Sequence, residues 1–214
     1  MKLVLYDYWR SSASYRVRIA LNLKGAAHER VAVNLLDGAQ DEEAYRAHNP
    51  QGLVPMLEAD GTRLTQSLAI IAWLDAHFPE PPLLPADGDE RAHVISLAMT
   101  IAADIHPLNN LRVLNYLRSP LGADEEAIKG WYRHWIATGL VGLEEQARRM
   151  SGDGRHMFGS TVTMADICLV PQMYNAVRFK CDLEPFPTLR AINSFLSAQA
   201  AFANAVPEVQ PDAP

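Results

Sequence analysis

Cysteine is scarce in this chain, since only Cys168 and Cys181 occur among its 214 residues. Two isolated thiols so far apart form neither a disulfide framework nor the CxxC motif of a metal or redox site. We therefore interpret both as buried or incidental thiols of a protein in a reducing compartment.

The motifs of nucleotide-binding and metal-dependent enzymes are also missing. The sequence has no GxGxxG, no GxxxxGK[ST], no HExxH and no GxSxG. Its seven histidines are scattered, and none lies three or four positions from another. We expect no metal site and no nucleotide site.

Long apolar runs are absent as well, and none approaches the ~20 residues that cross a bilayer. The first residues soon reach Asp7 and Arg10, so they do not resemble a signal peptide. We expect a cytoplasmic protein that does not bind membranes. The net charge of −6 disfavours nucleic acid as a partner but permits a positive pocket for an anionic substrate.

What the first eighty residues do contain is an alternation of strand and helix patterns. Strands are predicted at 2–8, 29–35, 54–59 and 63–65, and helices at 14–24, 41–48 and 67–78. This order predicts an α/β domain with a small mixed sheet. The proline-rich residues 81–89 read as a linker.

After the linker, strand signals disappear and long helical patterns take over, at 90–118, 124–150, 164–178 and 187–200. Pro107 should kink or break the first of them. Thr163 and Asp166 have the spacing of a capping box, and the tail 207–214 is predicted to be extended. We predict domains at 1–80 and 90–214, the second all-α.

A strand, a run of small polar residues and a helix meet at Tyr8–Arg18. Unpaired N–H groups at a helix start attract an anion such as a thiolate. The serine hydroxyls could donate to that anion, and Arg10 would add a full charge. On the residues alone, simple N-capping by Ser12 or Ser14, with solvent-facing arginines, explains this segment better than an anion site does.

Two further features favour a peptide-like ligand. Val54 precedes Pro55 at the start of a strand, where a cis bond would present a backbone edge to a peptide. Ser67 is a candidate N-cap at a second helix start and thus a second anion site. A peptide with a thiolate and a carboxylate, such as glutathione, fits all three positions.

The sequence resembles the zeta class of glutathione transferases, the maleylacetoacetate isomerase family. The resemblance covers nearly the whole chain in order. It rests on the segments 10–21 (RSSASYRVRIAL), 49–55 (NPQGLVP), 66–71 (QSLAII), 106–114 (HPLNNLRVL), 163–166 (TMAD), 178–180 (RFK) and 207–211 (PEVQP). It implies a thioredoxin-like first domain, an all-α second domain, a homodimer and glutathione as cofactor.

The resemblance also implies roles for individual residues. Ser11 would activate the thiol, with Ser12 beside it and Arg10 adding charge. The residues implied to hold glutathione are Gln40, Val54, Gln66, Ser67 and Asn109, together with Ser11. The resemblance implies that the bond from Val54 to Pro55 is cis. Arg10 and Arg178 would bind the carboxylates of a dicarboxylic keto acid.

One position departs from the family pattern, because many members have cysteine where this chain has Ala13. Catalysis would then depend on the glutathione sulfur alone. The implied activity is conversion of maleylacetoacetate to fumarylacetoacetate in aromatic amino acid catabolism. Maleylpyruvate isomerisation and conjugation of α-haloacids remain alternatives. Leu111 favours maleylacetoacetate, because maleylpyruvate enzymes are expected to have two adjacent arginines there.

Overall fold

The computed structural model describes residues 1–214, which form two compact units. The first unit comprises Met1–Leu83 and Ala198–Pro214, and the second comprises Leu84–Ser197. Residues 198–214 thus cluster with the sheet, although the sequence assigned them to the helical part. The division into domains 1–80 and 90–214 with a linker at 81–89 remains a prediction. No helix in the chain is both long enough and apolar enough to cross a bilayer.

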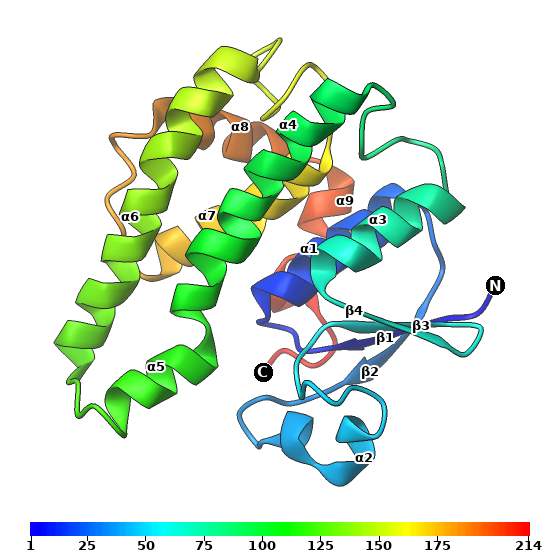
Figure 1. The fold of residues 1–214 in the computed structure, drawn as a ribbon, viewed down its shortest axis with the longest axis vertical. Helices are drawn as coiled ribbons and strands as arrows, with labels where there is room; N and C mark the ends of the chain where they lie inside the picture. The colour runs from blue at the N-terminus through cyan, green and yellow to red at the C-terminus, as the bar shows by residue number, and fades with distance from the viewer. The chain divides into compact units, whose positions relative to one another are not determined.

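The first unit is built on a mixed sheet of four strands in the order β2-β1-β3-β4. Its elements are β1 (Leu3–Asp7), α1 (Ser12–Leu23), β2 (Glu29–Ala32), α2 (Glu43–Arg46), β3 (Met56–Ala59), β4 (Thr62–Thr65) and α3 (Ser67–His77). β1 pairs parallel with β2 and antiparallel with β3, and β3 pairs antiparallel with β4. Figure 1 shows α1 and α3 side by side on one face of this sheet, and α2 on the other side. The predicted α/β arrangement is confirmed.

The core of this unit lies between the sheet and the helix pair. Leu5 and Leu57 of the sheet, Val17 of α1 and Ile70 and Leu74 of α3 are fully buried. Alternate residues of β1 point into this core, as a strand covered on one face requires. The core therefore fixes the starts of α1 and α3 relative to the strand ends.

The second unit is helical, as predicted. It contains α4 (Gly88–Met99), α5 (Leu111–Arg118), α6 (Glu125–Met150), α7 (Met164–Arg178) and α8 (Pro187–Ser197). The long helix predicted at 90–118 is broken by a π-helical turn, Thr100–Ile105, and a 3-10 turn, His106–Asn109, that contains Pro107. Gly139 lets α6 approach this break, since a Cβ there would lie 2.3 Å from Ile105.

One expectation about an irregular segment was wrong. The tail 207–214, which follows α9 (Ala200–Ala203), is not extended: it contains a 3-10 turn, Pro207–Val209, and Gln210 is buried. The proline-rich segment after α3 is tied down, because Leu83 and Leu84 are buried and the Lys24 Nζ donates to the Pro81 carbonyl at 2.5 Å.

Candidate functional site

The strand directions gather three of the predicted segments at one edge of the sheet. β1 and β4 run the same way because each is antiparallel to β3. Tyr6, Met56 and Thr65 align across the three strands. The turn after β1, the residues before β3 and the turn after β4 therefore emerge side by side.

The turn after β1 holds Arg10, Ser11 and Ser12. Ser11 is the N-cap of α1, and its Oγ accepts a hydrogen bond from the Ser14 N–H at 3.3 Å. The cap is thus Ser11 rather than Ser12 or Ser14. Because the Ser11 hydroxyl accepts here, its proton stays available to donate to a bound anion. Ser12 is buried as the first helical residue, and the half-buried Arg10 lies over the Trp9 ring, 5.6 Å from its centroid.

The turn after β4 differs from the prediction in one respect. Gln66, not Ser67, is the N-cap of α3, and it has a positive φ of 69° and no side-chain cap bond. Ser67 is the first helical residue and is buried. A non-glycine residue in this backbone region is strained, and such residues cluster at binding sites. The Gln66 side chain is exposed and donates from its Nε2 to Gln51 Oε1 at 3.1 Å.

A buried arginine joins these two helix starts. Arg16 of α1 is 1% exposed, and its Nη1 donates to the Ser67 Oγ at 3.3 Å. The helical pattern of α1 alone did not indicate that Arg16 would be buried. Its guanidinium adds a positive charge beneath the two helix starts, which favours an anion at this edge.

The residues before β3 are held by two side chains that the sequence analysis missed. Tyr45 and Asn49 both donate to the Leu53 carbonyl, at 2.6 Å and 2.7 Å. Burial raises the pKa of Tyr45, so its hydroxyl keeps the proton that it donates. These bonds fix the half-buried Val54 beside Pro55, and the Val54–Pro55 bond is cis as the resemblance implied.

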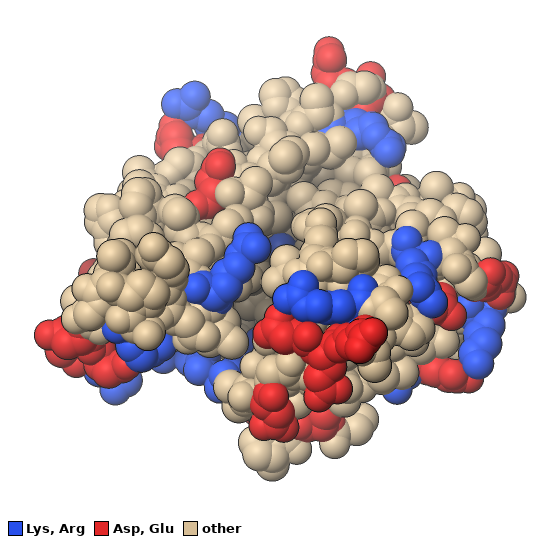
Figure 2. All heavy atoms as spheres, turned by 60° about the horizontal axis from the view of Figure 1, so that its bottom comes forward, with Lys and Arg blue, Asp and Glu red and all other residues tan.

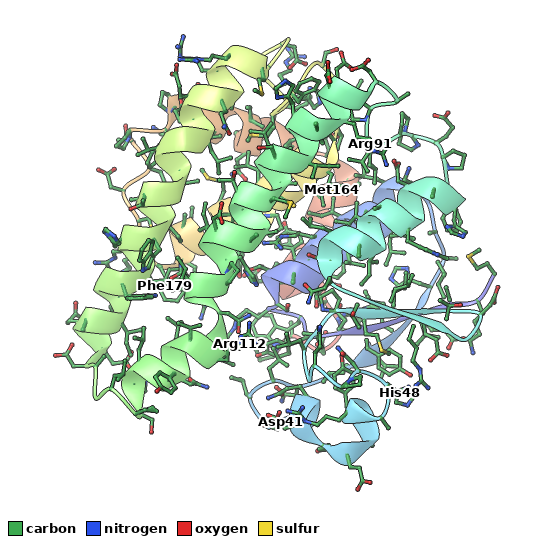
Figure 3. The ribbon with its side chains drawn as sticks, viewed as in Figure 1. Asp41, His48, Arg91, Arg112, Met164 and Phe179 are labelled. Carbon is green, nitrogen blue, oxygen red and sulfur yellow. The ribbon has the colours of Figure 1, made fainter.

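Gln40 lies in a 3-10 turn, Ala39–Asp41, ahead of α2. Its Nε2 donates to Asp41 Oδ2 at 2.8 Å, and its Oε1 is buried without a partner. Gly52 contacts this turn: a Cβ there would lie 3.0 Å from the Gln40 carbonyl and from Arg46. Asp41 and His48 mark this region around α2 in Figure 3. The unpaired oxygen of Gln40 is an acceptor for a ligand N–H.

Asn109 and Arg178 lie in the second unit, apart from this group in the chain. Asn109 is buried in the 3-10 turn before α5; its Nδ2 donates to the Tyr132 carbonyl at 3.4 Å, and its Oδ1 has no partner. Arg178 is the exposed last residue of α7 and lies 5.1 Å from the centroid of the Phe179 ring. Phe179 stacks on Tyr132, with ring centroids 3.5 Å apart, at the end of α7 labelled in Figure 3.

The two helix starts at the sheet edge carry no negative charge of their own. Neither α1 nor α3 has an acidic residue in its first turn. The first turns of α4, α6 and α7 each contain Asp or Glu. A helix start carries partial positive charge that a local carboxylate neutralises. The two starts at the sheet edge therefore keep their capacity to bind an external anion.

Elsewhere on the surface, charges of both signs are mixed. Figure 2 shows acidic and basic side chains close to one another on the face that it draws, without a large patch of one sign. Many of them form ion pairs, such as Arg46 with Asp41, Arg118 with Glu125 and Lys129 with Glu126. No group of three or more His, Cys, Asp or Glu side chains lies together in a way that could hold a metal ion.

Comparison with known proteins shows the family of this chain. Residues 5–82 match the family model "Glutathione S-transferase, N-terminal domain". A probable maleylacetoacetate isomerase of Vibrio cholerae is 50% identical, over 100% of this chain and 99% of its own. The chain belongs to the zeta class of the glutathione S-transferase family. The chain has the fold of this enzyme family, a thioredoxin-like unit and a helical remainder.

Other zeta-class relatives are similarly close. A maleylpyruvate isomerase of Ralstonia is 47% identical, over 97% of this chain and 98% of its own. The holo structure of a bacterial maleyl pyruvate isomerase of the zeta class superposes with a TM-score of 0.96 at 46% identity, covering 99% of this chain and 100% of that one. A maleylacetoacetate isomerase of Anaeromyxobacter dehalogenans, solved with glutathione in its active site, has a TM-score of 0.89 at 46% identity, covering 100% of this chain and 98% of that one.

Proposed function

We propose that this chain is a glutathione-dependent cis–trans isomerase that converts maleylacetoacetate to fumarylacetoacetate. The observation that carries the proposal is the sheet edge, where two acid-free helix starts flank the residues before β3. A tripeptide with a thiolate and a terminal α-carboxylate matches these groups in charge. The chemistry that bound glutathione supplies is a thiolate nucleophile able to add to an activated double bond and leave it again.

The residues of the first unit would divide the work of holding this cofactor. The Ser11 hydroxyl donates to the sulfur, and Ser12 and Arg10 stabilise its negative charge, which lowers the thiol pKa. Val54 pairs with the peptide backbone. The γ-glutamyl carboxylate is placed at Gln66 and Ser67, where the α3 start and the buried Arg16 favour an anion. Gln40 contacts the glycyl end.

The family resemblance extends the proposal to the second unit and to the assembly. Asn109 would contact glutathione, and Arg178 together with Arg10 would bind the carboxylates of the keto acid and stabilise charge that develops during the reaction. On the same basis we propose a cytoplasmic homodimer acting in aromatic catabolism. Light scattering after size-exclusion chromatography gives the mass of the particle and tests the dimer.

Maleylpyruvate is the second candidate substrate, because the Ralstonia relative and the superposed holo structure both bear that activity in their names. Leu111, 37% exposed at the start of α5, is the residue that favours maleylacetoacetate. Leu111→Arg would place two arginines side by side with Arg112. We expect this variant to raise the preference for maleylpyruvate over maleylacetoacetate.

One assay tests the main proposal. The purified protein is given each maleyl acid with glutathione at a small fraction of the substrate concentration, and loss of the cis isomer is followed by absorbance. We expect complete conversion with glutathione recovered. If neither acid isomerises while an α-haloacid consumes glutathione mole for mole, the chain is a conjugating transferase and the proposal is wrong.

A further inference from the structure

The C-terminal segment returns to the turn that carries the proposed thiolate site. Figure 1 shows the red end of the chain beside the blue turn between β1 and α1. The segment is folded on itself, since the buried Gln210 donates from its Nε2 to the carbonyls of Asn204 and Val206, at 3.1 Å and 2.8 Å. Asp212 follows directly and makes the contacts that matter here.

The Asp212 carboxylate bridges two parts of the sheet unit. Its Oδ2 accepts from the Trp9 backbone N–H at 2.9 Å, and its Oδ1 accepts from Arg30 Nη2 at 3.0 Å. Arg30 also donates to Gln210 Oε1 at 2.9 Å. The side chain of Asp212 is 17% exposed, so solvent screens these contacts only in part.

These contacts continue into a buried charge network. Arg30 Nη2 donates to Asp7 Oδ2 at 2.6 Å, and Arg18 Nη1 donates to Asp7 Oδ1 at 2.9 Å. The side chains of Asp7 and Arg18 are 0% and 3% exposed. Burial lowers the pKa of Arg18, and Asp7 opposes this effect. Arg18 also donates to the Trp9 carbonyl at 2.9 Å.

Trp9 is thus held from both sides by charged groups. Its N–H donates to Asp212, and its carbonyl accepts from Arg18. The next residues along the chain are Arg10 and Ser11, and the Ser11 N–H donates to the Tyr8 carbonyl at 2.9 Å. Charge-assisted bonds of this kind are stronger than neutral ones. The backbone that presents Ser11 is therefore set by a residue about two hundred positions away.

We propose that Asp212 is a positioning residue of the thiolate site, which acts through the Trp9 backbone to set the Ser11 hydroxyl and Arg10. This proposal rests on the function proposed above, since it concerns the same site. It differs from a purely structural role in its consequence. Loss of Asp212 should change the chemistry of a bound thiol, not only the stability of the fold.

The test compares Asp212→Ala with Asp212→Asn. The Ala variant loses both contacts, whereas Asn keeps an oxygen for the Trp9 N–H and loses only the charge beside Arg30. Asp89→Asn, which removes one charge from the exposed first turn of α4, is the control. The measurements are the ultraviolet titration of the bound glutathione thiol, the pH profile of kcat/KM, and amide hydrogen exchange at residues 9–12 without ligand.

We expect Asp212→Ala to raise the pKa of the bound thiol, to lower kcat about tenfold and to speed exchange at residues 9–12, because small misplacements of catalytic groups are costly. Asp212→Asn should lie between Asp212→Ala and the unchanged protein, and Asp89→Asn should match the latter. Unaltered thiol titration and exchange in Asp212→Ala, whatever its melting temperature, overturn the proposal. Failure of the unchanged protein to bind glutathione would instead refute the proposed function, and the exchange data would still decide whether Asp212 holds the turn.

Discussion

The helix starts of this protein are of two kinds, and the difference separates binding from scaffolding. In the second unit, carboxylates satisfy the starts of most helices: Asp87 caps α4, Asp124 caps α6, and Asp166 completes the capping box of α7, whereas the uncharged Asn110 caps α5. At the start of α8, Glu144 accepts from the N–H groups of Thr188 and Leu189 at 2.9 Å and 3.0 Å.

The starts of α1 and α3 have no such carboxylate. α1 has a serine cap with one long bond, and α3 begins at a strained Gln66 without any cap bond. Leaving these N–H groups without an internal anion costs stability that a cap would supply. The partial positive charge at the starts of α1 and α3 is therefore available to a ligand. The contrast can be tested by removing a carboxylate from one kind of start and adding one to the other.

The largest effect is expected at the best satisfied start. Asp166 is fully buried and accepts from the N–H groups of Met157 and Thr163, at 2.7 Å and 2.8 Å, and from the Thr163 hydroxyl at 2.8 Å. Asp166→Ala leaves several buried donors without an acceptor, so we expect a loss of about 3 kcal/mol or more in the free energy of unfolding.

Urea denaturation measures this loss. Asp124→Ala, which removes an exposed cap from α6, is the matched control and should cost about 1 kcal/mol. An equal cost for the two variants would show that burial of the α7 box adds nothing to its strength.

Next in size is the effect of removing the Ser11 hydroxyl. We expect Ser11→Ala to lower turnover by about 10²-fold, as expected for loss of a group that stabilises the reacting anion. The same variant loses the bond from the Ser14 N–H and should cost about 1 kcal/mol of stability. Steady-state kinetics and denaturation separate the two effects.

Asp124→Ala again supplies the control, with a similar cost in stability and no change in turnover. An unchanged turnover in Ser11→Ala would transfer the proposed role to Ser12.

Adding a carboxylate to the start of α1 should have a smaller effect. It should raise the stability of the protein and weaken its binding of glutathione. Ala13 lies in the first turn of α1, where Asp should stabilise the helix by about 0.5 kcal/mol. The same charge repels a bound thiolate, so we expect Ala13→Asp to weaken glutathione binding about tenfold or more. Isothermal titration calorimetry measures the affinity.

Ala127→Asp places the same charge in the exposed first turn of α6 and should leave binding unchanged. If Ala13→Asp binds glutathione as tightly as the unchanged protein, the open start of α1 is not part of the anion site.

Local patterns allowed part of this contrast to be predicted from the sequence. The capping box of Thr163 and Asp166 was predicted correctly, because its two residues are only three positions apart. The mixed sheet and the helical second half followed from hydrophobic periodicity. The family resemblance supplied the cis bond at Val54–Pro55, which periodicity alone does not determine.

What the sequence missed depends on contacts between distant residues. The cap of α3 was assigned to Ser67, but the Ser67 hydroxyl accepts from Arg16, which is 51 positions away. The tail was expected to be extended, yet Asp212 accepts from the Trp9 N–H, 203 positions away. Composition near Asp212 is proline-rich and carries no sign of that partner. Such pairings are fixed only when the sheet and its covering helices have formed.

The smallest expected effect concerns the titration of the buried α7 box. Burial raises the pKa of Asp166 to about 6, while the bonds from Met157 and Thr163 partly oppose this rise. A carboxyl whose pKa is higher in the folded protein contributes stability below its unfolded pKa, and that contribution is lost as the pH rises through its folded pKa. We therefore expect the stability difference between the unchanged protein and Asp166→Asn, which cannot titrate, to fall by about 1 kcal/mol or more between about pH 4 and pH 6. A difference that stays constant across this range would mean that burial does not raise the pKa of Asp166, so that the α7 start keeps its carboxylate ionised throughout.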